Sequence, residues 1–115
     1  MNTSTKNTPL FHRIYDFLCL WHMYTKKFPK SDRYTLGQKG FSTLLDILTI
    51  VMKAEYLPRE KKKFTLLEIS PHLDMVKILI RLSYSLQIVT DKDYIRLETE
   101  VEEIGKMLGG WIRSL

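Results

Sequence analysis

Basic side chains are the residues of this sequence best suited to chemistry, because lysine and arginine bind phosphates and carboxylates. Between residues 26 and 39 the basic residues far outnumber the single acid, Asp32. The basic residues there are Lys26, Lys27, Lys30, Arg33 and Lys39. Residues 91–106 instead hold six acids and three bases. This polarity predicts a cationic surface that attracts phosphate backbones, although a solvated basic face explains the composition equally well.

Lys77 and Arg81 stand one helical turn apart inside the apolar segment MVKILIRL. Cations are not buried without partners. Two arrangements are therefore open. Either both side chains lie on an outer stripe where protein and polyanion contacts adjoin, or they pair with acids such as Asp74.

Catalytic and metal-binding patterns are weak in this chain. His12, His22 and His72 are not at metal-ligand spacing, and the sequence contains no HExxH, P-loop or GxGxxG motif. Cys19 lies between two leucines and is expected to pack as a small hydrophobe. We expect no catalytic residue, no metal site and no cofactor.

Glycines interrupt the last apolar pattern, in GKMLGGWIRSL. Each costs a helix about 1 kcal/mol relative to alanine. Gly105 and Gly109 share one face, which predicts that another helix packs closely there, from this chain or another subunit, with Trp111 filling the adjacent space. A fraying helix end is the alternative.

The chain that must position these residues has 115 residues and 44% hydrophobic content, enough for one core. Its apolar residues recur with a helical period in four stretches, about 9–27, 32–56, 61–89 and 91–114. This pattern predicts one all-α domain, an up-down-up-down four-helix bundle. Ser31 or Asp32 is expected to cap the second helix. Pro71 either kinks the third helix or lies at its restart after a Ser70 cap.

The chain carries a net charge of +5 and a single cysteine. One cysteine excludes an internal disulfide framework and favours a reducing compartment. The N-terminal segment MNTSTKNTPL lacks the apolar region of a signal peptide, and no apolar run approaches the ~18 residues of a membrane helix. We therefore expect a cytoplasmic protein without a membrane partner.

Three segments resemble one known family. FPKSDRYTLGQKG, LDMVKILIRLSYSLQIV and above all EVEEIGKMLGGWIRSL are similar to the Avd accessory proteins of diversity-generating retroelements. A looser similarity extends to four-helix-bundle proteins encoded by intervening sequences in bacterial 23S ribosomal RNA genes. The resemblance covers residues 11–115, although Pro71 departs from the family pattern.

The Avd resemblance implies a homopentamer with a positive surface that binds RNA and DNA with little sequence preference. It also implies association with the element's reverse transcriptase in support of mutagenic retrohoming. The family's basic positions on the third helix fall on Lys77 and Arg81. The expected contacts with nucleic acid or reverse transcriptase are Lys26, Lys27, Lys30, Arg33, Lys77, Arg81 and Arg113. The looser similarity implies an alternative, a structural or protein-interaction bundle without a specific nucleic-acid role.

Overall fold

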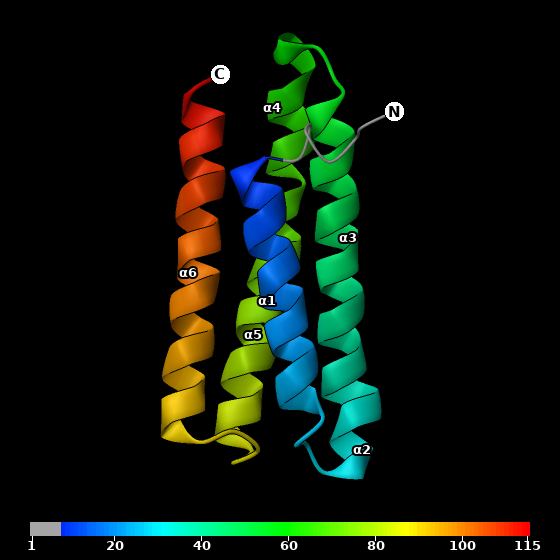
Figure 1. Ribbon diagram of the computed structural model, residues 1–115, viewed down its shortest axis with the longest axis vertical. Helices are drawn as coiled ribbons and strands as arrows, with labels where there is room; N and C mark the ends of the chain where they lie inside the picture. Colours follow the sequence, from blue (N-terminus) through cyan, green and yellow to red (C-terminus); the bar gives the residue numbers. More distant parts are fainter. Residues whose placement is uncertain (1–7) are drawn as a thin grey trace.

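The structure, a computed structural model, describes residues 8–115. Residues 1–7 lie outside the described part. They hold most of the N-terminal segment MNTSTKNTPL, in which the sequence shows no apolar region of a signal peptide. Four long helical segments run antiparallel to one another (Figure 1). This arrangement confirms the predicted all-α, up-down-up-down four-helix bundle. No helix within residues 8–115 combines the length and the apolar content that crossing a bilayer requires.

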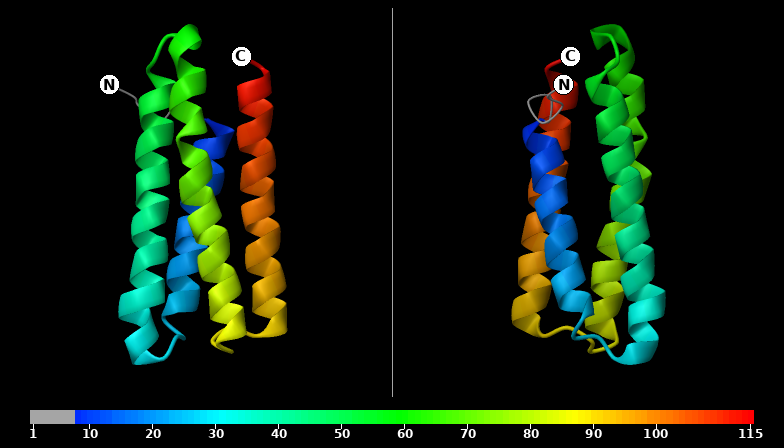
Figure 2. Two further views of the ribbon diagram at one scale, coloured as in Figure 1. Left: turned by 180° about the vertical axis from the view of Figure 1, so that it is seen from behind. Right: turned by 45° about the vertical axis from the view of Figure 1, so that its right-hand side comes forward.

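The bundle places its four segments in a square. The helix α1 (Pro9–Thr25) packs against α3 (Gln38–Glu55) and α6 (Asp91–Arg113), and α5 (Ile69–Ser85) packs against the same two helices. Two connections between long helices lie at one end of the bundle, residues 26–37 and residues 86–90 (Figure 2). We call this the α2 end, after the short helix α2 (Lys30–Asp32) within the first connection. The opposite end holds the start of α4 (Arg59–Leu67) and is called the α4 end.

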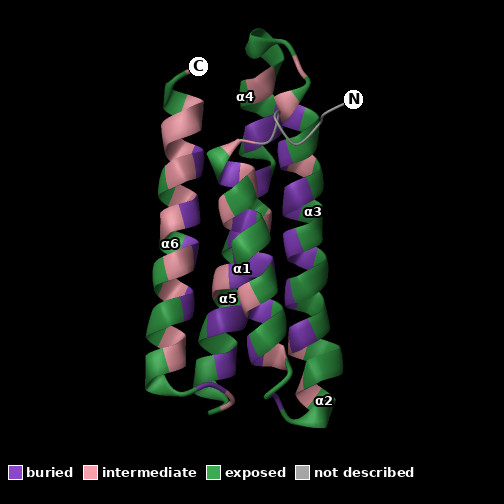
Figure 3. Ribbon diagram, viewed as in Figure 1, coloured by how far each residue is buried: buried purple, intermediate pink, exposed green. Residues whose placement is uncertain are grey.

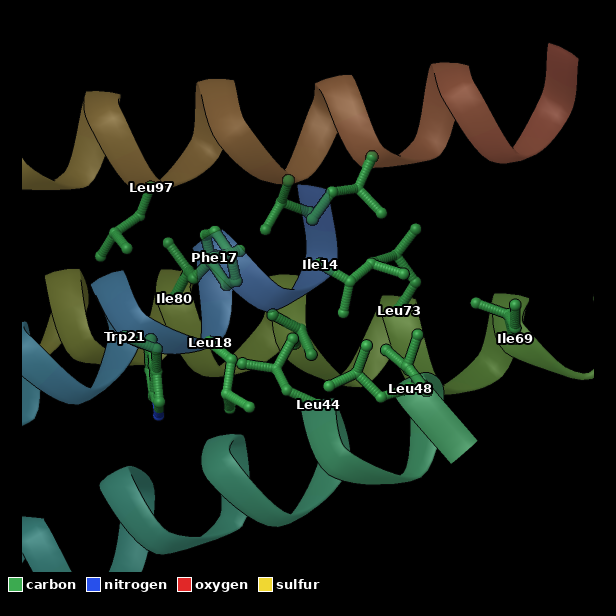
Figure 4. Packing of buried hydrophobic residues seen from close by; sticks show 14 of the residues in the cluster. Ile14, Phe17, Leu18, Trp21, Leu44, Leu48, Ile69, Leu73, Ile80 and Leu97 are labelled. Carbon is green, nitrogen blue, oxygen red and sulfur yellow. The ribbon is translucent and has the colours of Figure 1, made fainter. Parts of the chain in front are cut away.

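Inward-facing aliphatic residues form one core along the length of the bundle (Figures 3 and 4). Ile14, Leu44, Ile80 and Leu97, one from each side of the square, are fully buried. Each occupies the apolar stripe that the helical period predicted. Burial of this stripe is the main favourable contribution to folding.

Trp21 is the largest buried side chain and determines how closely α1 and α3 approach. Its indole Nε1 donates a hydrogen bond of 3.0 Å to the carbonyl of Gly37. A Cβ atom on Gly40 would lie only 2.4 Å from the indole ring. Gly40 therefore makes room for the indole, a role that the one-dimensional apolar pattern did not predict.

The second helical segment begins two residues before the predicted start. Pro29 precedes it in an extended conformation, and no side chain caps α2, so the expected cap at Ser31 or Asp32 is wrong. Between α2 and α3 the chain forms a π-helical turn, η2 (Arg33–Gly37), in which Gln38 N–H reaches the carbonyl of Arg33. Such a turn holds one residue more than an α-helical turn and changes which residues face the core.

The third segment is kinked rather than restarted. Its two helices, α4 and α5, are separated by Glu68 alone, whose φ of −65° and ψ of −18° remain helical. Pro71 has no N–H to bond the carbonyl of Leu67 and its ring crowds that carbonyl, which explains an interruption at this point. No side chain caps α5, so a restart capped by Ser70 is wrong.

The third segment also ends four residues before the predicted position. Gln87 adopts a φ of 62°, which a right-handed helix does not allow. Its N–H bonds the carbonyl of Tyr84 at 2.9 Å, and the N–H of Ile88 bonds that of Ser83 at 2.8 Å. This pair of bonds is a Schellman motif, which closes a helix end.

Candidate functional site

Most cations of the described chain are not neutralised by a neighbouring carboxylate. Within residues 8–115, the one pair closer than 4.0 Å joins Arg13 Nη2 and Glu100 Oε1, at 3.3 Å. It links the facing sides of α1 and α6 near the middle of the bundle. The remaining described lysines and arginines keep a positive field available to an anionic ligand.

The α2 end collects four of the predicted site residues. Lys26, Lys27, Lys30 and Arg33 lie in and just after the turn between α1 and η2, and all four are exposed. The Arg33 side chain also stabilises this turn, because its Nε donates a 3.1 Å hydrogen bond to the carbonyl of Phe28. The structure thus places four of the seven predicted residues on one short segment.

Two further cations join this end from α6. Lys92 and Arg96 line a groove of about 280 Å³ together with Lys27, Tyr24 and Asp93. Sequence reasoning missed Lys92 and Arg96 because their segment is acidic overall. They are 65 or more positions from Lys27 in the sequence, and only closure of the bundle brings them beside it.

Two tyrosines near this end are unsuited to act as bases. Burial, followed by the charge of Asp93, raises the pKa of Tyr24. Tyr84 donates a 2.7 Å hydrogen bond to Asp91, which raises the pKa of Tyr84. Both phenols stay protonated at neutral pH. Within residues 8–115, no three His, Cys, Asp or Glu side chains gather into a group that could hold a metal ion.

Lys77 and Arg81 stand seven and three residues before Tyr84, so by the helical period they share the face of α5 on which Tyr84 stacks against Tyr94 of α6. The half-buried Lys77 and the exposed Arg81 have no carboxylate within 4.0 Å, so the predicted alternative of pairing with Asp74 is wrong. The stacked rings of Tyr84 and Tyr94, 4.2 Å apart, fix the register of α5 against α6.

That register places acids close to the level of these two cations. The helices are antiparallel, so each step back along α5 from Tyr84 matches a step forward along α6 from Tyr94. By this count Arg81 lies level with Leu97, one residue before Glu98, and Lys77 lies level with Val101, one residue before Glu102. These carboxylates are not hydrogen-bonded to the cations, but they reduce the positive potential of this face relative to the α2 end.

Arg113 does not belong to either group. It ends α6 at the α4 end, about 33 Å along the helix from Asp91 by the usual rise of 1.5 Å per residue. Two other cations at that end bond the carbonyls of helix termini. Arg59 Nη2 donates to the carbonyl of Ser114 at 2.6 Å, and Lys62 Nζ donates to that of Ala54 at 2.7 Å. Within one chain, Arg113 therefore lies apart from both the basic segment at the α2 end and the face of Lys77 and Arg81.

The glycines of α6 have no closely packed helix from this chain beside them. A Cβ atom on Gly105 would meet Leu73 at 3.8 Å, an ordinary contact, and one on Gly109 would meet only the guanidinium of Arg113. Close approach within the chain is thus excluded, and approach by another subunit stays a prediction. Trp111 lines an apolar groove at the α4 end with Leu10 and Met107.

Comparison with known protein families gives a match over most of the chain. The model of a family described as bAvd-like matches residues 10–115. No curated protein matches the chain.

Proposed function

Since the chain belongs to the bAvd-like family, we propose that it is a non-catalytic accessory protein of a diversity-generating retroelement. In this proposal a homopentamer binds template RNA and cDNA and associates with the element's reverse transcriptase, in support of mutagenic retrohoming. The protein performs no chemistry itself. It holds nucleic acid next to the enzyme that copies it.

The observation that carries the proposal is the set of unneutralised cations at the α2 end. Lys26, Lys27, Lys30 and Arg33 are exposed there, Lys92 and Arg96 lie nearby, and none of the six has a carboxylate within 4.0 Å. Binding of a phosphate backbone by such cations releases counterions, which supplies affinity without sequence preference. We therefore assign the nucleic-acid contact to the α2 end.

We assign Lys77 and Arg81 to the contact with reverse transcriptase. Glu98 and Glu102, each one residue past their level on α6, repel phosphates, whereas a protein surface with both signs of charge complements such a face. Neutralising Lys77 and Arg81 should therefore weaken capture of the reverse transcriptase more than binding of free RNA.

Nucleic-acid binding is tested by two variants with the same loss of charge. The triple variant Lys26→Gln, Lys27→Gln, Lys30→Gln removes three cations from the α2 end. We expect it to weaken RNA binding and to reduce the slope of log affinity against log salt by about 2–3, at 0.7–0.9 per lost phosphate contact. Fluorescence anisotropy with a labelled RNA, from about 50 to about 200 mM salt, measures both quantities.

The matched control removes three cations near the α4 end, as Lys53→Gln, Lys61→Gln, Lys63→Gln. All six positions are exposed, so both variants should keep the wild-type fold, which circular dichroism verifies. Equal loss of affinity in the two variants would mean that net charge alone drives binding, and it would overturn the assignment to the α2 end. No RNA binding by the wild-type protein would overturn the proposed function.

A protein-interaction role without nucleic acid is the second candidate, and a different observation favours it. Phe41, Leu45 and Met52 lie along one side of α3 and are each about 40% exposed. Exposed apolar residues at helical spacing are typical of a surface that contacts another protein. This role predicts that the wild-type protein captures a partner protein but no RNA.

The proposed pentamer predicts a particle of five times the 13.6 kDa chain mass. The exposed apolar side chains and the surface around Gly109, where a Cβ would meet only the Arg113 guanidinium, are available for assembly. Light scattering coupled to size-exclusion chromatography measures the mass. A particle with the mass of one chain, across a range of protein concentrations, would contradict the assembly.

A further inference from the structure

We propose that a groove at the α2 end holds an unpaired base of a single-stranded nucleic acid, with Tyr34 stacking on the base and Lys26 and Arg33 contacting its phosphates. This inference rests on the proposed function and specifies its ligand as single strands rather than duplexes. The groove lies between the end of α1 and the π-helical turn η2.

The groove is an open depression large enough to hold a nucleobase. It measures about 370 Å³, within the usual range for ligand pockets. Aromatic rings line the groove from two helices, His22 from α1 and Phe41 from α3. These two rings lie 6.0 Å apart at an angle of 56°. Its lining is His22, Thr25, Lys26, Arg33, Tyr34, Gly37, Gln38 and Phe41. Aromatic rings set among cationic and polar side chains suit a nucleobase together with its phosphates.

Tyr34 lines this groove but does not pack in the core. It is 67% exposed, although tyrosine buries a large apolar ring when it packs in a core. The extra residue of the π-helical turn directs Gly37 toward Trp21 and leaves Tyr34 outward. Single π turns are frequent at functional sites. An exposed ring beside a groove is available to stack on a base.

The charges around Tyr34 fit a phosphate backbone. Lys30 precedes it by one helical turn, and Lys26 and Arg33 line the same groove. No carboxylate lines this groove. The groove between α1 and α6 that holds Lys27 also contains Asp93, and the groove that holds Arg13 also contains Asp16 and Glu100. Those acids oppose an anion, so the groove beside Tyr34 is the more favourable of the three.

Stacking on Tyr34 requires a base that is free of its own stack. In a duplex the faces of the bases are covered by their neighbours, whereas a single strand offers them to aromatic side chains. Such stacking tolerates any base, because every base has a flat face. The inferred site therefore discriminates single strands from duplexes but not one sequence from another.

The test compares Tyr34→Ala with Tyr34→Phe, using a labelled oligothymidine or oligouridine and a blunt-ended hairpin duplex of equal phosphate number whose loop is a non-nucleotide linker. We expect Tyr34→Ala to weaken single-strand binding by about 5- to 150-fold, the effect of losing one stacked base. Hairpin binding should stay at the wild-type level, and the salt slope should not change, because no charge is lost. Tyr34→Phe keeps the ring and should retain wild-type affinity.

Tyr15→Ala is the matched control, because Tyr15 is also exposed, at 52%, but does not line the groove. Wild-type affinity of Tyr34→Ala for single strands, or an equal loss for hairpin and single strand, would overturn the stacking site while leaving the proposed function intact. Failure of the wild-type protein to bind either probe would overturn both. Circular dichroism should show the same helix content in all variants, and a loss confined to unfolded protein would count against the site.

Discussion

Gly40→Ala is expected to lower the free energy of unfolding by about 2 kcal/mol, although alanine is the better helix former. Its Cβ would lie 2.4–2.5 Å from three atoms of the Trp21 indole. That ring cannot move freely, because it is fully buried and bonded to the carbonyl of Gly37. The added methyl group must therefore push α1 and α3 apart. Urea unfolding followed by circular dichroism, at a fixed protein concentration, measures the change.

Gly110→Ala is the control for this prediction. A Cβ there would meet nothing closer than 4.0 Å, at the flexible guanidinium of Arg113. Alanine should therefore show its ordinary advantage in a helix, about 0.5–1 kcal/mol of added stability. If Gly40→Ala stabilised the protein by a similar amount, the close contact between Gly40 and Trp21 would be contradicted.

Trp21→Ala is expected to have the largest effect of any single substitution proposed, about 3–5 kcal/mol of lost stability. The change removes a fully buried indole and leaves a cavity among rigid neighbours, including Phe28, whose ring lies 5.9 Å away. It also removes the donor that Nε1 provides to the carbonyl of Gly37. Thermal and urea unfolding measure the loss.

The second tryptophan provides the comparison. Trp111 is only half-buried and makes up one wall of a groove at the α4 end, so Trp111→Ala should cost much less than Trp21→Ala. Equal losses would contradict the central role of Trp21. In the double variant Trp21→Leu, Gly40→Ala, the smaller side chain leaves room for the new Cβ. The two changes should then destabilise the protein by less than the sum of their separate effects.

Trp21 links the stability of the bundle to the candidate site. The carbonyl that its indole bonds belongs to Gly37, and Gly37 also lines the groove beside Tyr34. The same contact therefore holds the π-helical turn against α1 and fixes the floor of the groove. Packing inside the bundle thus positions the cations and the aromatic ring on its surface.

The residues that share a helix could be assigned to faces from the sequence. Ile14, Leu44, Ile80 and Leu97 are buried as their spacing predicted, because a period of 3.6 residues is a local property of the chain. The capping of the last helix is likewise local, because the Thr90 side-chain oxygen accepts a 3.1 Å hydrogen bond from the N–H of Asp93, three residues on. The family resemblance also came from local motifs and is confirmed over residues 10–115.

What the sequence by itself determined is therefore the four helical segments, the centre of each inward face, the family and the basic segment that begins at Lys26. Tertiary structure alone decided which distant residues meet. It joined Lys92 and Arg96 to Lys27, separated Arg113 from them by the length of α6, and made Gly40 the partner of Trp21. The physical reason is that helix formation follows from neighbours three or four positions apart. Contacts between helices depend instead on the register in which the closed bundle packs.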